Sequence, residues 1–495
     1  MSPSRPLAKF AVSAALLVAC AANTRAEVIT YPAPADVRYT SGRYSITVNP
    51  TDDRAAPLAS FVYQSQNPFT RNHQLIGRSN HWTTFSFSGS VTVTVTAHDR
   101  AAIRSCVIRP TAYGIPVEVA GRTVRFTLDR PRQVCVELDG ERTDPLFVFA
   151  KELETDLPDL TATNVIDFGK SPAVHNDPKK PNILYFPPGE YDLVAMGYDR
   201  HHGFPLDAGD IVYLAGGAIV HGCFGSTGER VTVRGRGIIS GAKWRWVRQR
   251  YEEANIPWSY AKYREIAVYL HGGGHNVIEG ITITDPVHFC TSVADDSTVR
   301  GIQCFGWWYT TDGVFAGERS VVEDCFFKVN DDIIKVYSTD MQVRRCVIWQ
   351  QNNGAPFQFS WNHTKPVQGV RVSDCIIMAS EVTADRQLMG NRSVFNCRLN
   401  KGAALSDYRF ENIRIEGDIY RLLGLNIGEA GSIRGVTLRN IEVTGRIQYF
   451  NYLNATAGKI SDIAIENLTL AGTPARTLDE FIVVTRGDVS GVTIK

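Results

Sequence analysis

Three aspartates lie close together in a stretch of the chain that is rich in aromatic residues. Asp312 follows Thr310-Thr311 and precedes Gly313, and the second group is Asn330-Asp331-Asp332. Hydrolysis of a glycosidic bond needs a protonated carboxyl, which protonates the leaving oxygen, and an ionised carboxylate, which acts as base or nucleophile. Because close carboxylates repel one another, one member of such a group keeps its proton near neutral pH while another ionises. These residue types therefore fit acid–base cleavage of a glycosidic bond.

Aromatic side chains surround the three acids. Four of the chain's eight tryptophans fall between Trp307 and Trp361. We expect several rings of this stretch to face outward and to stack on sugars, because a stacked β-structure fills its interior mainly with smaller aliphatic residues. The rings expected to bind substrate are those of Trp308, Tyr309, Tyr337, Trp349 and Trp361.

The elements that must position these residues are read from an internal repeat. An apolar anchor residue recurs about every 23 residues between Ile281 and Leu468, and it is Ile, Leu or Cys. A position that accepts these residues interchangeably is a buried apolar slot, so we interpret its cysteines as core residues and not as metal ligands. A period of this length in β-rich sequence predicts a solenoid of stacked coils. The anchors are residues 281, 302, 325, 346, 375, 397, 413, 441 and 468.

The repeat brings the acids together. Asp312 and Asp332 are 20 residues apart, which is close to one period, and the residues that follow them align apolar on apolar. The two carboxylates are therefore expected on neighbouring coils, with Asp331 beside them. The anchors lie 10 residues before Asp312 and 7 residues before Asp332, so one coil must carry a three-residue insertion. A structural alternative remains, since Asp-Gly and Asp-Asp are common turn pairs.

The remaining sequence divides into three parts. Residues 1–26 have a basic start and a short apolar run, which is typical of an export signal. Cleavage after Ala26 and lipidation of Cys20 are both compatible with this segment. Residues 27–165 show the strict alternation of half-buried antiparallel strands and predict a β-sandwich. Residues 166–495 predict a solenoid of about 13 coils at this period. Cys106 and Cys135 lie on predicted sandwich strands, either as a disulfide or as two thiols.

Composition narrows the partners. The chain has 495 residues and a formal net charge of +1. A balanced charge argues against a nucleic-acid partner, which would require a clustered basic face. It also gives no support to a polyanionic substrate. We expect no metal and no other cofactor, and a monomer.

The combination of an N-terminal β-sandwich, a right-handed parallel β-helix, Thr-Asp-Gly and a following Asn-Asp-Asp resembles glycoside hydrolase family 49, the dextranases and isopullulanase. The resemblance covers nearly all of the mature chain and includes His81 to Gly89 and Leu214 to Ala218. It implies an exported inverting enzyme acting on an α-glucan. By the motif match it implies Asp331 as general acid, and Asp312 and Asp332 as the pair that holds and activates water. Asn330 and Lys335 match positions that tune the cluster or bind sugar hydroxyls. Inversion predicts carboxyl separations of roughly 6.5–9.5 Å.

Two other functions remain as alternatives. A pectinase on polygalacturonate would share the aspartates, but downstream of Asp332 the chain has neither Gly-His-Gly nor Arg-x-Lys. A non-catalytic adhesin or carbohydrate-binding β-helix would explain the solenoid and the aromatic residues, but not three acids at coil spacing. The linkage cleaved, α-1,6 or α-1,4, and the compartment, periplasmic, outer-membrane-anchored or extracellular, stay open.

Overall fold

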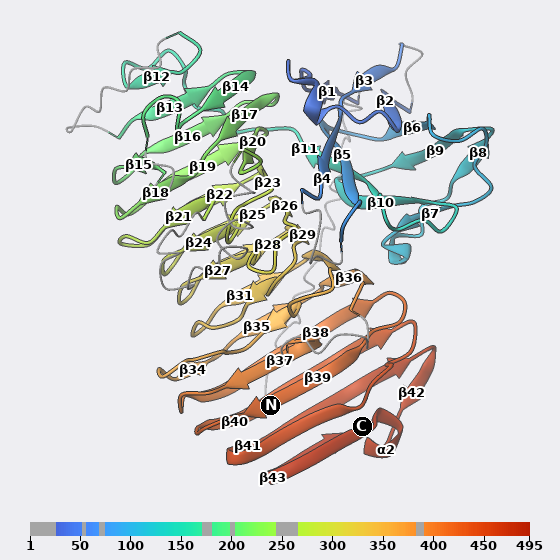
Figure 1. The fold of residues 1–495 in the computed structure, drawn as a ribbon, viewed down its shortest axis with the longest axis vertical. Coiled ribbons are helices and arrows are strands. Elements are labelled where there is room, and N and C mark those ends of the chain that lie inside the picture. The colour runs from blue at the N-terminus through green and yellow to red at the C-terminus, as the bar shows by residue number, and fades with distance from the viewer. Residues whose placement is uncertain are drawn as a thin grey trace, which may run out of the picture.

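The computed structural model describes residues 26–51, 56–68, 75–170, 181–198, 203–243, 266–382 and 391–495. Most of the expected export signal, including Cys20, lies outside these residues. Within the described residues the chain is almost entirely β-structure, and no helix there is long and apolar enough to cross a membrane. Figure 1 shows two bodies side by side, a blue N-terminal one and a tall stack of strands running from green to red.

The N-terminal body consists of two packed sheets. Valines of β6 point inward and its threonines outward, as the alternation of this segment predicts. Valines, phenylalanines and leucines of both sheets fill the space between them. One sheet contains β1 (Val28–Thr30), β5 (Ser79–Phe87), β11 (Leu146–Glu152), β10 (Arg132–Leu138) and β7 (Cys106–Arg109), with β4 (Val62–Gln66) also on β5. The other contains β3 (Leu58–Ser60), β2 (Tyr44–Pro50), β6 (Val91–Ala97), β9 (Thr123–Leu128) and β8 (Glu118–Ala120).

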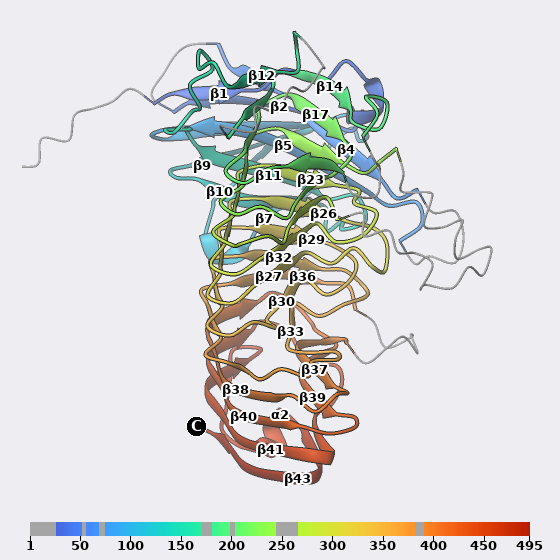
Figure 2. The same cartoon turned by 90° about the vertical axis from the view of Figure 1, so that its left-hand side faces the viewer.

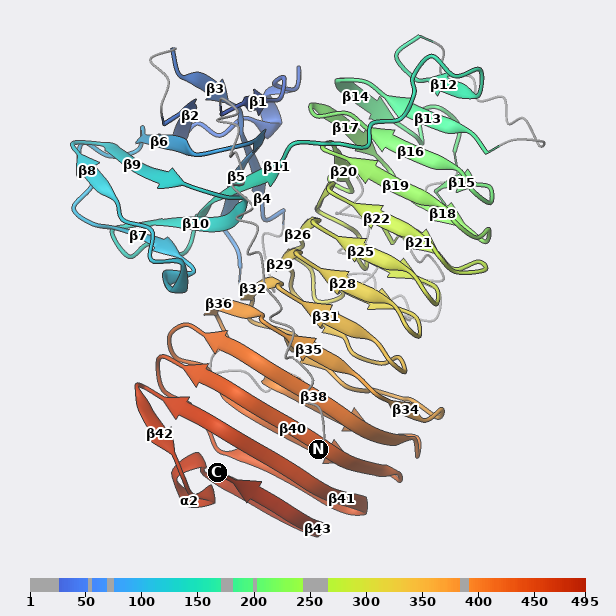
Figure 3. The ribbon, with the colours of Figure 1, turned by 180° about the vertical axis from the view of Figure 1, so that it is seen from behind.

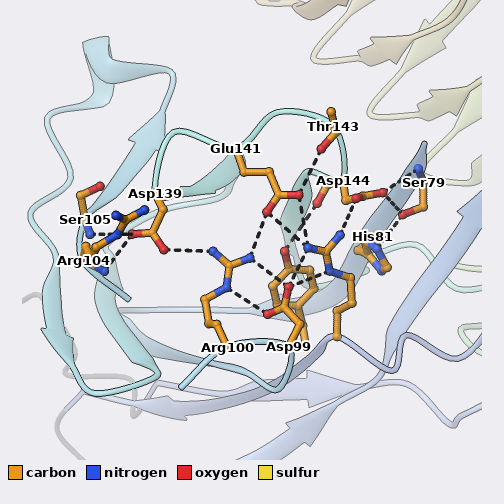
Figure 4. A network of polar contacts seen from close by, with 12 residues as sticks. Ser79, His81, Asp99, Arg100, Arg104, Ser105, Asp139, Glu141, Thr143 and Asp144 are labelled. Atoms are coloured by element: carbon orange, nitrogen blue, oxygen red, sulfur yellow. Dashed lines mark hydrogen bonds and ion pairs between the residues drawn. The ribbon is translucent and has the colours of Figure 1, made fainter. Parts of the chain in front are cut away.

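An ion-pair network joins the loops at one end of the sandwich (Figure 4). Arg43 contacts Asp99 at 2.6 Å and Asp144 at 2.5 Å, and Arg100 contacts Asp99 and Glu141 at 3.0 Å. Networks of several half-buried charges hold loops better than isolated surface pairs do. The network lies within the sandwich and has no part in the cluster of three acids.

The two sandwich cysteines are free thiols. Cys106 pairs across the sheet with Leu138, and Cys135 pairs with Arg109, so the two residues do not face one another.

The second body is a parallel β-helix, which confirms the predicted fold class. Strands β12 (Val165–Asp167) to β43 (Val483–Ile494) form one continuous sheet of 32 strands, in which most strands pair with the third strand along the chain. Each coil therefore contributes one strand to each of three faces (Figure 3). Thirteen strands stack on one another along the first face, from β12 at one end to β43 at the other. This number agrees with the predicted number of coils.

The strands are assigned to these faces as follows. The first face contains β13 (Ile183–Phe186), β16 (Ile211–Leu214), β19 (Thr232–Gly235), β22 (Val277–Glu279), β25 (Thr298–Arg300), β28 (Val321–Glu323), β31 (Gln342–Arg344) and β35 (Arg371–Ser373). The second contains β14 (Gly189–Asp192), β17 (Ala218–His221), β20 (Ile238–Ser240), β23 (Thr282–Thr284), β26 (Gln303–Phe305), β29 (Phe326–Lys328), β32 (Val347–Gln350) and β36 (Ile376–Ser380). The third contains β15 (Phe204–Leu206), β18 (Phe224–Ser226), β21 (Val268–Leu270), β24 (Thr291–Val293), β27 (Val314–Ala316), β30 (Ile334–Lys335), β33 (Phe357–Gln358), β37 (Ser393–Leu399) and β39 (Arg421–Ile427). The last coils use longer strands that bend across faces: β38 (Ala404–Ile415), β40 (Ser432–Val443) and β41 (Asn451–Leu470), with β34 (Val367–Gln368), β42 (Thr473–Ala475) and α2 (Leu478–Phe481) beside them.

The repeated anchors form an internal ladder at the turn between the first and second faces. Cys325, Cys346 and Cys375 are fully buried there, as the interpretation of these cysteines as core residues requires. The residue before each anchor except Cys397 has positive φ, which explains why Gly, Asp and Asn recur at that place, with Arg345 as the one other residue type. Cys397 is a correction to the predicted ladder. It lies in β37 on the third face and pairs with Leu425, because the coil after Cys375 is longer than the period.

The sandwich packs against the outside of the second face. Phe147 lies 4.9 Å from Phe326 and 5.6 Å from Trp349 between ring centroids, and Trp82 lies 4.8 Å from Phe305. These rings belong to one buried cluster that joins the two bodies. One side of the solenoid is therefore covered, and aromatic residues that point outward on it are buried under the sandwich.

Candidate active site

Asp312 and Asp332 occupy equivalent places at the start of neighbouring strands of the third face. Val314 pairs with Ile334 and Phe315 with Lys335, which is the alignment expected from the apolar residues. The Gly313 N–H donates to the Asp332 carbonyl at 3.1 Å. The three-residue insertion lies in the turn before β27, since residues 306–313 connect β26 to β27 whereas residues 329–333 connect β29 to β30.

The three acids form a tight cluster with one lysine. One carboxylate oxygen from each of Asp312, Asp331 and Asp332 lies within 4.8 Å of the others. The Lys335 ammonium is 3.3 Å from Asp312 Oδ2 and 3.6 Å from Asp332 Oδ2. Asp312 and Asp332 are buried, and Asp331 is half-buried and the most exposed of the three. The cluster therefore has a buried, lysine-bound side and an open side at Asp331.

Hydrogen-bond donors approach both oxygens of Asp332. Trp361 Nε1 donates to Oδ2, and Asn391 Nδ2 donates to Oδ1 at 3.0 Å. The Ala355 N–H also approaches Oδ1, at 3.3 Å. Hydrogen bonds to a carboxylate favour its ionised form and fix its orientation. Asp332 is thus held rigidly as an acceptor.

Asn391 was missed by the sequence reasoning. It lies 59 residues after Asp332, at the start of β37, and its amide also comes within 3.5 Å of Asp331 Oδ1. Its sequence surroundings, Asn391-Arg392-Ser393, match a glycosylation acceptor pattern and give no catalytic signal. Only the long coil between β36 and β37 brings it to the acids.

Burial and mutual repulsion set the protonation of the cluster. Burial raises the pKa of Asp312 to about 7, with a further increase from Asp332, although Lys335 opposes this change. Burial and the carboxylates of Asp312 and Asp332 raise the pKa of Asp331 well above its usual value. Burial lowers the pKa of Lys335, but the neighbouring carboxylates outweigh it and the net pKa is raised. The cluster can thus hold a proton near neutral pH.

The carboxyls are closer than expected for inversion. The sequence-based expectation was a separation of roughly 6.5–9.5 Å, whereas the nearest oxygens lie within 4.8 Å. The cause is the parallel register, which sets two acids on adjacent strands spaced about 4.8 Å apart.

Two of the predicted substrate-binding residues are buried for structural reasons. Trp349 is fully buried between the solenoid and the sandwich, and its Nε1 donates to Glu381 at 2.7 Å. Asn330 is also fully buried, and its amide donates to the Trp307 carbonyl at 2.9 Å. Trp349 is not available to a sugar, because the sandwich covers the second face. The Asn330 side chain holds the turn before Asp312, so it does not offer itself to sugar hydroxyls, and the alternative that it tunes the cluster stays a prediction.

Other predicted rings have mixed placements. Trp308 is only 6% exposed and packs with Leu75 of the sandwich, so its ring offers little surface to a sugar. Tyr309 is half-buried beside it. Trp361 is half-buried and contacts Asp332 through its indole nitrogen, so it orients the acid. Tyr337 is largely buried but borders a groove next to the acids.

That groove has a volume of about 520 Å³ and runs beside the far ends of β24, β27 and β30. Phe315 and Tyr337 both line it. Phe315 is the strand partner of Lys335, and Tyr337 follows Lys335 by two residues. His363 lies 4.5 Å from Tyr337 between ring centroids, and burial together with Lys335 lowers its pKa. The groove has polar and aromatic lining residues, as a sugar site requires, and the three aspartates lie beside it and not among those residues.

The three carboxylates could also serve as ligands for a cation. Carboxylate oxygens suit hard divalent ions. In this cluster, however, the Lys335 ammonium already contacts two of the three acids. The donor set therefore fits a lysine-neutralised acid cluster better than a dedicated cation site.

A parallel β-helix with a sandwich on its second face carries three clustered aspartates on its third, an arrangement that fits acid–base cleavage of a glycosidic bond. The comparisons with known proteins agree. The chain is 23% identical over 480 residues to a dextranase of Arthrobacter globiformis, covering 80% of this chain and 74% of the relative. It is 25% identical over 366 residues to an isopullulanase of Aspergillus niger, covering 65% of this chain and 62% of the relative. The chain is thus similar to a dextranase and to an isopullulanase over 80% and 65% of its length.

The fold is similar to that of a solved structure. Dex49A from Penicillium minioluteum superposes with a TM-score of 0.70 at 19% identity, over 91% of this chain and 94% of that one. Other relatives are matched over less of their length, such as a dextranase of Talaromyces minioluteus, of which 56% is covered at 27% identity. No family model matches the chain.

Proposed function

We propose that this protein hydrolyses α-glucosidic bonds of a neutral glucan, dextran or pullulan. The observation that carries the proposal is the cluster of Asp312, Asp331 and Asp332 around Lys335 on the open third face. The substrate class is inferred from relatives named dextranase and isopullulanase. The linkage, α-1,6 or α-1,4, depends on the walls of the groove.

Asp331 is proposed as the general acid. It is the most exposed of the three acids, so it can reach a glycosidic oxygen, and burial and the neighbouring carboxylates raise its pKa, which favours its protonated form. A general acid contributes typically 10²–10⁴-fold to the rate. We therefore expect Asp331→Asn to lower kcat by about that factor while the protein stays folded.

Asp312 and Asp332 are proposed to hold and activate the attacking water. Their oxygens are close enough to share one water, and Lys335 lies against both. Asp332 has donors on both oxygens, which suits a fixed acceptor more than a nucleophile that must form a bond. We infer inversion on this ground.

Retention is the alternative to inversion. The two outcomes differ in the anomer released first. NMR of the earliest product of dextran cleavage should give the β-anomer for inversion. An initial α-anomer would establish retention.

The substrate proposal is tested by reducing-sugar release from dextran, pullulan and polygalacturonate. Release from either α-glucan, abolished in Asp331→Asn, supports the proposed function. Release from polygalacturonate alone would identify a pectinase. Binding of an α-glucan without release from any of the three would identify a non-catalytic carbohydrate-binding protein.

Export of a monomer is also proposed, with a sandwich over residues 27–165 and a catalytic β-helix over 166–495. The basic residues Arg5 and Lys9 and the apolar run after them support it. Mass spectrometry of the mature N-terminus decides between lipidated Cys20 and a chain that begins after Ala26. Sedimentation of the purified protein tests the monomer.

A further inference from the structure

Two large aromatic side chains are exposed on the last coils. Tyr449 is 44% exposed and Phe450 41% exposed, and both lie in the turn before β41. Tyr449 stacks on Tyr420 of the preceding coil with ring centroids 5.0 Å apart and an angle of 17° between the rings. Phe450 lies 5.5 Å from Tyr449. Exposed aromatic residues that gather in this way mark binding surfaces more often than scattered ones do.

Arg421 holds these rings in place. Its guanidinium lies 5.1 Å from the centroid of Tyr420, 5.9 Å from that of Tyr449 and 5.3 Å from that of Phe450. The Arg421 side chain is buried, and its Nε donates to the Phe450 carbonyl at 2.6 Å. Cation–π contacts with a desolvated guanidinium stabilise such an arrangement. We call Tyr420, Arg421, Tyr449 and Phe450 the aromatic platform.

The sheet register places the platform in line with the catalytic acids. Ile334 pairs with Phe357, Phe357 with Phe395, and Phe395 with Leu423. The residues two positions earlier in the chain are therefore also stacked on one another. They are Asp332, Ala355, Ser393 and Arg421. Figure 2 shows β30, β33, β37 and β39 stacked in that order along the solenoid.

The distance between the acids and the platform follows from this register. Arg421 lies three strands from Asp332, and Tyr449 lies one strand further. At about 4.8 Å per strand, the platform begins roughly 14–19 Å from the acids along the axis. The intervening coil carries Asn391, which touches Asp332, and Arg392, whose guanidinium lies 5.5 Å from the Tyr420 ring centroid. The coil between them therefore contacts both the acids and the platform.

We propose that the aromatic platform is a remote sugar-binding subsite, on which a pyranose ring of the same neutral α-glucan chain stacks against Tyr449 and Phe450. The proposal rests on the proposed function for its ligand class. An exposed aromatic face suits the apolar face of a neutral sugar, and the only cation of the platform is buried beneath the rings. Because of the distance, only chains of several sugars reach both the acids and the platform.

The test uses the full-length protein with Tyr449→Ala and the conservative Tyr449→Phe. For dextran polymer, Tyr449→Ala should raise KM about three- to tenfold, the range expected from loss of one aromatic stacking partner. Tyr449→Phe should keep the wild-type KM. For a trisaccharide of the same linkage, all three proteins should have equal kcat/KM. A matched control is Tyr185→Ala, since Tyr185 also stacks on a neighbouring tyrosine, Tyr213, but on a distant coil.

A second measurement separates this inference from the proposed function. In the Asp331→Asn background, calorimetric titration with dextran measures binding without cleavage, and adding Tyr449→Ala should weaken it by the same factor. Equal binding with and without Tyr449→Ala overturns the platform even where wild-type protein cleaves dextran. Weakened dextran binding in a protein that cleaves no α-glucan supports the platform and overturns the proposed hydrolysis. Equal losses of kcat/KM on polymer and trisaccharide also overturn the platform.

Discussion

Lys335→Met isolates the electrostatic contribution of one buried charge to the acid cluster. The substitution removes the ammonium and keeps a side chain of similar length. In the wild type the Lys335 Nζ lies 3.3 Å from Asp312 Oδ2 and 3.6 Å from Asp332 Oδ2. This charge opposes the effect of burial on Asp312, whose pKa is nevertheless raised to about 7. Without the lysine, burial and the Asp332 charge act unopposed.

The size of the effect follows from the distance. Two unit charges at 3.3 Å interact by about 5 kcal/mol at an effective dielectric constant near 20. An opposite charge at such a distance lowers a carboxyl pKa by about 1–3. Loss of Lys335 should therefore raise the pKa of Asp312 by about 1–3. Because the proposed base must be ionised, the acidic limb of kcat/KM moves to higher pH by the same amount.

The assay is kcat/KM for dextran as a function of pH, which reports the ionisation of the free enzyme. At a pH below both acidic limbs, kcat/KM falls about tenfold relative to wild type for every pH unit by which the limb has moved. Lys401→Met, at an exposed lysine on the turn after β37, is the matched control and should keep the wild-type profile. An acidic limb that stays in place, or moves to lower pH, would refute the assignment of Lys335 as the group that ionises the proposed base.

Three further predictions concern the same cluster. Asp312→Asn should stabilise the fold only at high pH. Because the pKa of Asp312 is raised from 3.8 to about 7 in the folded state, its ionisation as pH rises destabilises that state by up to about 4 kcal/mol. Urea unfolding should show the full gain at pH 8 and almost none near pH 3.5, and an equal gain at both would contradict the prediction. Asn391→Ala should lower kcat about 10- to 100-fold with little change in KM, because a hydrogen bond to charged Asp332 contributes about 1.5–3 kcal/mol, and unchanged steady-state kinetics would exclude this positioning role. Gly354→Ala should lower both melting temperature and kcat, since φ is +82° and a Cβ would lie 2.0 Å from the backbone carbon of Asp331. The control Gly402→Ala, at φ +81° with its nearest contact at 3.7 Å, should lose only the smaller strain energy. Equal losses in the two variants would show that the clash is relieved.

Much of the fold could be predicted because each coil of the solenoid has apolar residues at equivalent positions. The buried anchors and the apolar residues after Asp312 and Asp332 recur in each coil, so the register of the acids was readable from one sequence. Cys397 was assigned wrongly because one long coil breaks the period. Repetition is informative only where the coil length stays near the mean.

The site was predicted less completely because side-chain environment depends on neighbours distant in the chain. Trp349 has the same sequence signal as an exposed stacking ring, but Phe147 of the sandwich covers it. Asn391 reaches Asp332 only through a long coil, and its local pattern indicates something else. Lys335 was found through the motif match, and it lies three residues after Asp332, so local sequence was enough to place it beside the acid.

The packing of the sandwich has a consequence for how the solenoid comes apart. In a stack of coils, stability is a sum of coil and nearest-neighbour contributions, so unfolding tends to begin at an end. Sandwich contacts reach along the second face to the ion pair between Arg109 and Glu416, at 3.0 Å, and the strands after it lie clear of the blue body in Figure 1. The catalytic coils are thus clamped from outside, whereas the coils of β40, β41 and β43 depend on their neighbours alone. We expect hydrogen-exchange measurements to show that this C-terminal end opens first and that the amides around the three acids are among the most protected of the β-helix.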